Sequence, residues 1–170
     1  MRSYCIFCET NKCAAFASLA EKLLDCRAMY PKQIQHTFSK GIAADIEHDL
    51  TPGYVFLFSK EHSSPPDMAL ARNIPGFIRS LKGSDDSLEL AGDDERFAMM
   101  LFENGGVIGK TKVFSEGDRI RLTDSAFSGL EAEILKVNRR NQRMQIEIPF
   151  ANSKIKTWVE YEIVDSAANT

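Results

Sequence analysis

The 170-residue sequence lacks long apolar runs, a large charge of either sign and any familiar catalytic motif. No stretch approaches the roughly 18 apolar residues of a membrane span, and the N-terminus lacks the basic-then-apolar form of a signal peptide. The net charge of −3 argues against indiscriminate binding to polyanions. We therefore expect a cytoplasmic protein without a membrane partner, in which any nucleic-acid contact comes from a local patch.

Cysteine and histidine are scarce and spaced in a way that disfavours a metal site. The sequence has four cysteines and three histidines, and the histidines lie far apart. Cys5 and Cys8 form a C-x-x-C, but within a predicted strand side chains three residues apart point to opposite faces. A hydrolase built on a cysteine would lack a positioned base. The sequence therefore predicts reduced thiols, no metal, no cofactor and no enzymatic activity.

The strongest apolar segment is residues 54–59, Tyr-Val-Phe-Leu-Phe-Ser, which follows a Pro-Gly turn. Its β-branched and aromatic residues predict a central strand covered on both faces. Tyr54 and Phe56 share one face, and Val55 and Leu57 share the other. One face can serve the core of the domain. The other face is either covered by helices of the same domain or forms an aromatic patch for a partner.

The rest of residues 1–104 alternates between strand and helix patterns. The amphipathic stripe of the first helix is predicted to be Phe16, Leu19, Ala20 and Leu23. Residues 36–50 hold neither period for long and predict a hairpin loop. Strands are expected at 4–8 and within 74–81, and helices at 68–73 and from Asp93 to the glycines at 105 and 106. This order predicts an α+β domain with helices against a small antiparallel sheet.

After residue 104 the pattern changes. Residues 105–112, Gly-Gly-Val-Ile-Gly-Lys-Thr-Lys, are glycine-rich and predict an interdomain linker. Beyond it, apolar and polar residues alternate with period two in segments 119–122, 143–150 and 155–163. Short half-buried strands joined by tight turns predict a small β-barrel over residues 113–170.

Three segments resemble the NusG family of transcription factors. Residues 51–58 resemble the Pro-Gly-Tyr strand of its N-terminal domain, and residues 74–78, Ile-Pro-Gly-Phe-Ile, resemble a later segment. Residues 115–122 followed by 127–134 are similar to a KOW motif. The resemblance implies a NusG N-terminal-like antiparallel sheet with helices, followed by a small SH3-like KOW β-barrel. Among the specialised paralogs, the short first domain, the linker and the basic turn after Val137 look most like the LoaP type.

The resemblance also implies a docking surface. In this family the first domain binds the clamp helices of bacterial RNA polymerase through an apolar, aromatic surface. The matching positions here are Phe7, Tyr54 and Phe56, with Tyr4 nearby. Rigid aromatic side chains suit a coiled-coil partner because they supply contact area at small entropic cost. The alternative is that these four residues are ordinary core.

A basic cluster marks the second domain. Arginine grips phosphate, and the neighbouring Asn and Gln amides can bond base edges, so an RNA leader or hairpin is the expected ligand. The alternative is a solvated turn balanced by Glu131 and Glu133. The predicted nucleic-acid residues are Lys136, Arg139, Arg140 and Arg143, extended by Lys154 and Lys156.

Together these features predict a monomeric transcription elongation factor that binds RNA polymerase and promotes processive antitermination at selected operons. The KOW domain would supply RNA recognition. The alternative is a ribosome-associated or general RNA-binding KOW protein without antitermination activity. Binding of the aromatic surface to a polymerase coiled coil separates the two. The operons served, the recruiting nucleic acid and a ribosome contact stay open.

Overall fold

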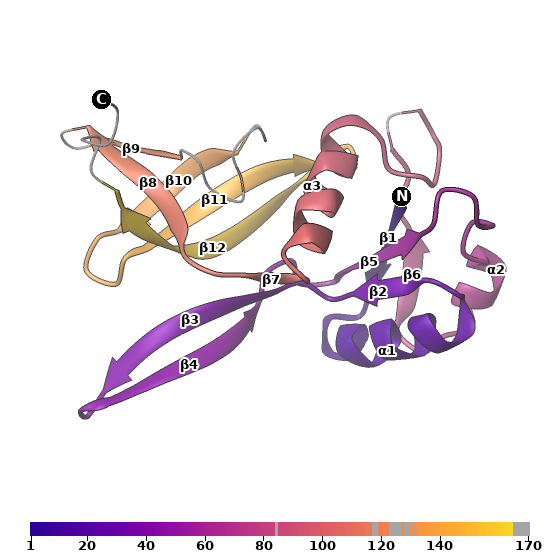
Figure 1. Cartoon of the computed structure of the whole chain (residues 1–170), viewed down its shortest axis with the longest axis horizontal. Helices are drawn as coiled ribbons and strands as arrows, with labels where there is room; N and C mark the ends of the chain where they lie inside the picture. The colour runs from indigo at the N-terminus through magenta and orange to yellow at the C-terminus, as the bar shows by residue number, and fades with distance from the viewer. Residues whose placement is uncertain (84, 117–118, 123–126, 128–129, 131, 165–170) are drawn as a thin grey trace.

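The computed structural model describes residues 1–83, 85–116, 119–122, 127, 130 and 132–164, which form two units and a long hairpin (Figure 1). The first unit is a four-stranded sheet of order β2-β5-β1-β6 with helices on both faces. The second is a five-stranded sheet of order β10-β11-β12-β8-β9. Within these ranges no helix is long and apolar enough to cross a membrane.

The first sheet is organised around β5 (Tyr54–Ser59), as the sequence predicts. β5 pairs antiparallel with β1 (Arg2–Cys8) on one side and with β2 (Arg27–Met29) on the other. β1 pairs in turn with β6 (Phe77–Ser80). Because β1 and β5 are interior strands, both of their faces need apolar cover.

α1 (Cys13–Leu23) covers one face of this sheet, following the 3-10 turn η1 (Thr10–Lys12). The predicted stripe is wrong at Leu19 and Leu23, which are 37% and 51% exposed. The buried face of the helix instead carries small side chains at Cys13, Ala17 and Ala20, spaced i, i+4 and i+7. These small side chains allow the helix to lie close to the sheet. Its buried residues are Cys13, Phe16, Ala17 and Ala20.

α3 (Gly92–Glu103) covers the other face, where Phe97 and Leu101 are fully buried. The Phe97 ring centroid lies 5.9 Å from that of Phe56 on β5. The short helix α2 (Met68–Ala71) begins where predicted. The Asp67 carboxylate caps it by accepting hydrogen bonds from two backbone N–H groups, those of Ala69 and Leu70.

The hairpin of β3 (Lys32–Ser39) and β4 (Ile42–Asp49) extends away from both sheets (Figure 1). The predicted loop over residues 36–50 is wrong, because antiparallel pairing runs from Lys32 and Asp49 to Ser39 and Ile42. Much of the hairpin is solvated on both faces, so its sequence carries no clear period-two signal. Lys40 and Gly41 both have positive φ, 51° and 80°, as a two-residue hairpin turn requires.

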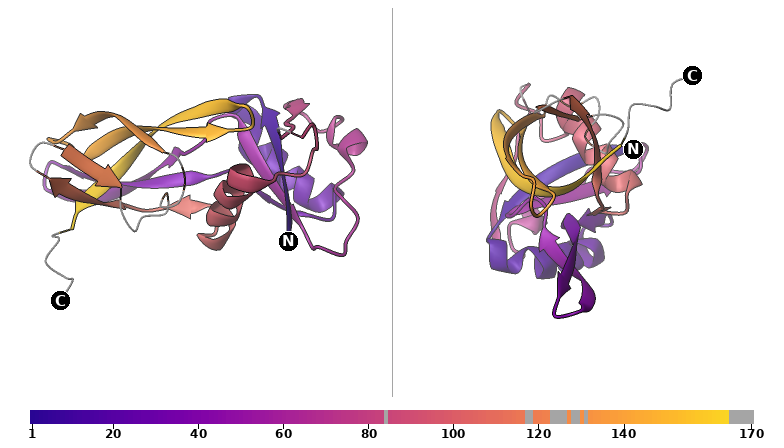
Figure 2. Two further views of the ribbon diagram at one scale, coloured as in Figure 1. Left: turned by 90° about the horizontal axis from the view of Figure 1, so that it is seen from above. Right: turned by 90° about the vertical axis from the view of Figure 1, so that its left-hand side faces the viewer.

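The second sheet confirms the predicted alternation in its two longest strands. These are β11 (Arg143–Phe150), with Met144, Ile146 and Ile148 buried, and β12 (Ser153–Ile163). The sheet curls (Figure 2), but no pairing in the described ranges closes β9 onto β10, so closure into a barrel stays a prediction. Gly117 and Gly129 of the predicted KOW motif lie outside the described residues. The remaining strands are β8 (Thr111–Glu116), β9 (Arg119–Leu122) and β10 (Glu133–Asn138).

The predicted linker, residues 105–112, joins the two units as a hydrogen-bonded connection. β7 (Val107–Ile108) pairs parallel with β3 at the base of the hairpin. The Lys32 N–H also donates to the Gly106 carbonyl at 2.8 Å. β8 then starts at Thr111, which pairs with Tyr161 of β12. The backbone therefore passes from one sheet system to the next with most of this segment paired.

The four cysteines are free thiols. Cys5 and Cys8 lie on opposite faces of β1, as predicted, Cys5 in the apolar cluster with Phe56 and Cys8 in the cluster under α1. Burial raises the pKa of Cys8 to about 12 and that of Cys26 to about 11. Both thiols are therefore protonated at neutral pH and are poor nucleophiles.

Candidate functional site

The aromatic face of the first sheet consists of Phe7 from β1 with Tyr54 and Phe56 from β5. Phe7 and Tyr54 are cross-strand partners, and their ring centroids lie 5.2 Å apart in an edge-to-face arrangement. Gly53 precedes Tyr54 with a φ of 91°, and a Cβ there would lie 2.6 Å from the Phe7 ring. Glycine at this turn therefore allows the strand to start directly beneath Phe7.

Phe150, at the end of β11 in the second unit, covers the aromatic face. Its ring centroid lies 6.0 Å from Tyr54, 5.5 Å from Phe56 and 5.6 Å from Phe97 of α3. Phe150 is 2% exposed and belongs to the same apolar cluster as the α3 side of the first sheet. Each such aromatic pair contributes about 0.5–1.5 kcal/mol beyond the area it buries. The two units therefore share one continuous apolar core at this point.

A hydrogen bond accompanies the Phe150 contact. The Ala151 N–H donates to Asp94 Oδ1 at 2.9 Å, linking the turn after β11 to the first turn of α3. Ala151 and Asn152 both have positive φ, 48° and 59°, which is the geometry of a tight hairpin turn. Burial raises the pKa of Asp94, and the hydrogen bond from Ala151 partly offsets that rise. Turn geometry and polar pairing thus hold the Phe150 end of the hairpin against α3.

Gln33, near the base of β3, makes a further polar contact to the second unit, this time from the β3–β4 hairpin. Gln33 is 1% exposed. In the amide orientation that satisfies both neighbours, it donates to the Trp158 carbonyl and accepts from the Glu160 N–H at 2.9 Å. This part of β12 lies just before the point where β8 begins to pair with it, at Tyr161. The Gln33 side chain therefore satisfies backbone groups that the strand ladder leaves open.

Tyr4 lies on the opposite face of the sheet from the other three predicted docking residues. It pairs with Leu57, is 2% exposed and belongs to the cluster under α1. Alternation along β1 explains this, because Tyr4 and Phe7 are three residues apart. Phe56 is fully buried, and Phe7 and Tyr54 are half-buried. The expectation of an exposed four-residue patch is therefore corrected to a three-residue face that the second unit covers.

The basic turn between β10 and β11 is exposed at Arg139 and Arg140. The Asn138 side-chain oxygen shapes it by accepting a hydrogen bond from the Asn141 N–H at 3.1 Å. Arg143 starts β11 on the outer face of the second sheet, and its guanidinium carbon lies 5.8 Å from the centre of the Trp158 ring. The turn thus presents arginines on a defined backbone.

Lys154 and Lys156 lie apart from this turn, near the other end of the β11–β12 pair. Both bind the buried Glu147 carboxylate, at 2.5 Å and 3.3 Å. The hydrogen bond from Lys154 is the main cause that lowers the pKa of Glu147, and the same contact raises the pKa of Lys154. Register separates them from the turn, since Arg143 pairs with Glu160 whereas Glu147 pairs with Lys156. The structure therefore does not gather the six predicted basic residues into one patch.

No protein-family model and no curated protein matches the sequence. Among solved structures, the chain is similar to one that describes domain interaction in Thermotoga maritima NusG. The similarity covers 94% of this chain and 93% of the NusG chain, with a TM-score of 0.53 and 13% identity. The fold is NusG-like. At this identity the similarity establishes the fold alone. It supports the predicted α+β, NusG-like architecture, whereas a closed KOW barrel as a separate second domain stays a prediction.

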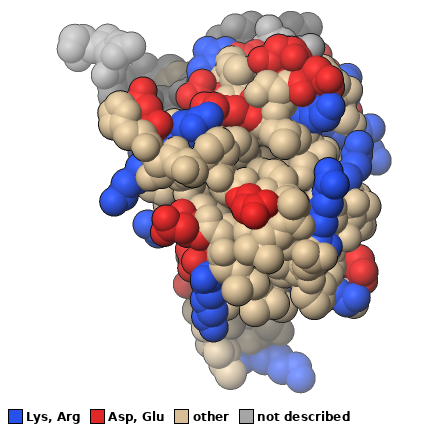
Figure 3. Space-filling view, turned by 90° about the vertical axis from the view of Figure 1, so that its right-hand side faces the viewer, with Lys and Arg blue, Asp and Glu red and all other residues tan. Residues whose placement is uncertain are grey.

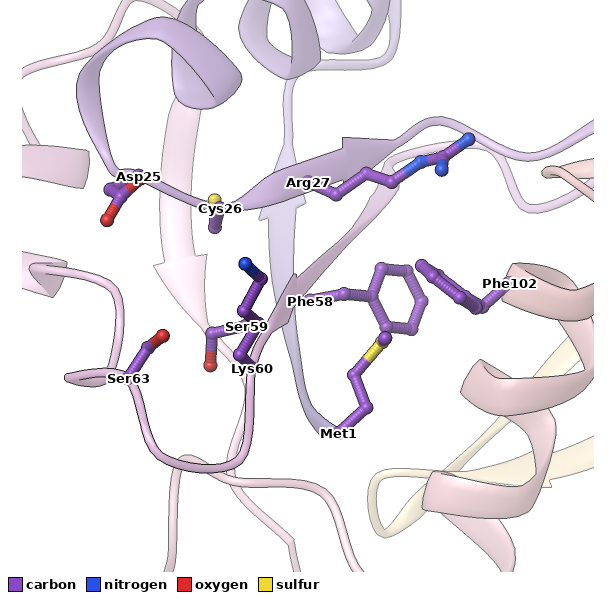
Figure 4. A pocket seen from close by; sticks show the side chains of 9 residues that line it. All are labelled: Met1, Asp25, Cys26, Arg27, Phe58, Ser59, Lys60, Ser63 and Phe102. Carbon is purple, nitrogen blue, oxygen red and sulfur yellow. The ribbon is translucent and has the colours of Figure 1, made fainter.

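A cavity of about 250 Å³ opens at the edge of the NusG-like first unit, at the end of β5 farther from Tyr54 (Figure 4). The rings of Phe58 and Phe102, with centroids 4.9 Å apart, form its apolar side. The Arg27 guanidinium carbon lies 5.4 Å from the centre of the Phe102 ring. Cys26 also lines the cavity, but its pKa of about 11 makes the thiol a poor nucleophile. We assign no chemistry to this cavity.

The end of the molecule formed by the first unit carries mixed charge (Figure 3). Lysine and arginine alternate with aspartate and glutamate around a broad uncharged region. A polyanion is held by several positive charges along its path, without acidic groups between them. This surface of the first unit therefore lacks the continuous positive path that a nucleic acid needs.

Sequence reasoning missed Phe150, Gln33 and Trp158. Phe150 continues the alternation of β11, so the sequence places it in the core but cannot show that its ring reaches another sheet. Gln33 carries no signal, because it lies in a polar stretch of β3. Trp158 had one usable signal: it occupies an outward position between the inward residues Thr157 and Val159.

Proposed function

We propose that the protein is a transcription elongation factor that binds bacterial RNA polymerase through its aromatic face. The observation that carries this proposal is that Phe150, from the other unit, covers this face together with α3. An apolar face closed by a separate unit can exchange that cover for another apolar partner. The polymerase clamp helices, a coiled coil, present a ridged apolar surface that half-buried rings can grip.

Bridging the clamp would favour its closed state and so promote processive antitermination at selected operons. This activity needs binding energy and geometry and requires no catalysis. In the arrangement described above the aromatic face is covered, so polymerase binding requires the two units to separate. The apparent dissociation constant is then the intrinsic value divided by the fraction of open molecules.

The second unit is proposed to recognise an RNA leader or hairpin through its basic turn. The chain has a net charge of −3, so a general positive field cannot supply the affinity. Arg139 and Arg140 are exposed on a turn whose backbone the Asn138 side chain stabilises. Amide side chains on the same turn can add hydrogen bonds to unpaired base edges.

We expect Tyr54→Glu to abolish capture of the full chain by core RNA polymerase while cooperative thermal unfolding is retained. Tyr54 is half-buried, so a carboxylate there stays hydrated, yet it removes a ring from the centre of the face. Loss of such an anchor weakens an interface by about 30-fold or more. Leu19→Glu, at a 37% exposed site on α1 across the sheet, is the matched control and should bind as the parent does. Unchanged binding by Tyr54→Glu would mean that the polymerase contacts another surface, and absence of capture of the parent would favour the general RNA-binding alternative.

Replacement of Arg139, Arg140 and Arg143 with alanine should greatly weaken RNA binding and leave polymerase capture intact. The three arginines lie on the second unit, away from the aromatic face. Loss of three phosphate contacts should flatten the log–log salt dependence of RNA binding by about 2 to 3, from roughly 0.7–0.9 counterions per contact. Filter binding of a leader RNA over a salt series measures this. If the triple variant binds the leader RNA as tightly as the parent does, the turn is a solvated loop without a role in RNA binding.

A further inference from the structure

Trp158 is the sole tryptophan of the chain and stands on the outer face of the second sheet. It is 36% exposed and is among the large hydrophobic residues that the structure leaves in contact with solvent. The inward positions on either side of it are occupied by Thr157 and Val159, both buried. The indole therefore lies outside the apolar core of the sheet, and part of the residue is open to solvent.

The neighbours of Trp158 form a row across three strands. Gln145 of β11 lies directly opposite Trp158, and Lys136 of β10 lies opposite Gln145. Arg143, one outward position along β11, brings its guanidinium carbon to 5.8 Å from the indole ring centre. The buried Nε of Arg143 has no hydrogen-bond partner among the described residues. An indole, an amide and two cations are thus gathered on one exposed face.

The nearest acidic side chains on this face, which would repel phosphate, are paired, buried or in a neighbouring row. Glu147 is neutralised by Lys154 and Lys156. Glu160 lies directly opposite Arg143 and is 4% exposed, so its carboxylate is withdrawn from the solvent-facing surface, and its Oε2 has no hydrogen-bond partner among the described residues. Glu133 is exposed but pairs with Glu147, on the row next to that of Trp158 and on the side away from Arg143. The charged group that the structure places against the indole ring is the Arg143 guanidinium. This is the combination that single-stranded nucleic acids bind: an aromatic surface for a base and cations for the adjoining phosphates.

We propose that Trp158 is a stacking platform for an unpaired base of nucleic acid, with Arg143 and Lys136 holding the adjoining phosphates. Gln145, between them, can hydrogen-bond the edge of the stacked base. The proposal rests on the nucleic-acid role proposed for the second unit, and it identifies the binding surface as the outer face of the sheet with the basic turn at one end. It assigns no such role to Lys154 and Lys156, which bind Glu147.

Tryptophan fluorescence of the unmodified full chain, excited selectively over the four tyrosines, reports directly on this site because Trp158 is the sole tryptophan. Titration with short oligouridine or oligothymidine should quench the emission saturably, and a blunt RNA duplex of equal length should quench much less. Equal quenching by both single strands would indicate readout of bases alone. Stronger quenching by oligouridine would indicate that the 2′-hydroxyl is also read. Either result supports the platform, whereas the absence of saturable quenching by both strands overturns it.

Affinity for a labelled oligonucleotide, measured by anisotropy, gives the second readout. Trp158→Ala should weaken binding about 5- to 150-fold, the range for loss of one base–aromatic stack. Trp158→Phe should recover most of that loss. Ile163→Ala, at a 47% exposed site on the same strand, is the matched control with no expected change. If Trp158→Ala binds as the parent does while the triple arginine variant does not, the platform is wrong and the basic turn stands. If the parent itself binds no RNA, the proposed RNA recognition fails as well.

Discussion

Phe150→Ala should raise the affinity of the full chain for core RNA polymerase by about 100-fold or more where the closed arrangement dominates. The Phe150 ring lies among Tyr54, Phe56 and Phe97, all in the other unit. Truncation of a buried phenylalanine costs about 3–5 kcal/mol, and here that cost falls on the contact between the units. The open fraction rises accordingly, and apparent affinity rises with it until opening no longer limits binding. Titration of labelled protein against core polymerase measures the change.

The matched control is Phe38→Ala, the same substitution at a 77% exposed site near the tip of the β3–β4 hairpin. It should leave polymerase affinity unchanged. Phe150→Leu retains an apolar side chain of intermediate size and should fall between parent and alanine variant. Weaker polymerase binding by Phe150→Ala would mean that Phe150 contacts the polymerase itself or that the closed form is the active one. Either outcome contradicts the proposed exchange of partners.

Phe56→Glu should abolish cooperative thermal unfolding of the first unit, and with it polymerase binding. Phe56 is 0% exposed and has two rings from separate elements packed on it, Phe97 and Phe150. The change removes about 3–5 kcal/mol of packing and buries an unpaired carboxylate, which adds several kcal/mol more. A domain stability of about 5–15 kcal/mol does not reliably survive such a loss. Near-ultraviolet circular dichroism during a thermal scan reports the result.

Ile78→Glu provides the matched control on the same sheet. Ile78 is 49% exposed on β6, so the new carboxylate stays in water and the unfolding transition should persist. A cooperative transition in Phe56→Glu, similar to that of Ile78→Glu, would mean that the ring at position 56 is readily uncovered. That outcome would support the interpretation, made from the sequence, that Phe56 belongs to an exposed aromatic patch.

The sequence predicted what depends on local periodicity. The unbroken apolar run of β5 placed it inside a sheet, and strict alternation placed Met144, Ile146 and Ile148 on one face of β11. The division of Tyr54 and Phe56 from Val55 and Leu57 follows from the same period of two. The division of side chains between the two faces of a strand does not depend on what packs against each face. It could therefore be predicted without the tertiary structure.

The sequence could not predict what depends on which surfaces meet. Alternation makes Phe150 an inward residue but does not show that its ring enters a core built by another sheet. The same limit separates Lys154 from the arginine turn, because Glu147, its partner, is brought beside it by strand register. The paired strands of the β3–β4 hairpin were not predicted from the sequence. A two-stranded ribbon that is solvated over much of both faces needs no alternating apolar pattern.

A photo-crosslinker in place of Tyr54 tests the central claim most directly, since it reports what lies on the aromatic face in each state. Tyr54→p-benzoylphenylalanine should cross-link within the free protein to the segment around Phe150, whose ring centroid lies 6.0 Å from that of Tyr54. Addition of core RNA polymerase should move the cross-link to the clamp helices and diminish the internal product. Persistence of the internal cross-link in the polymerase-bound protein, or a polymerase cross-link away from the clamp helices, would contradict the claim.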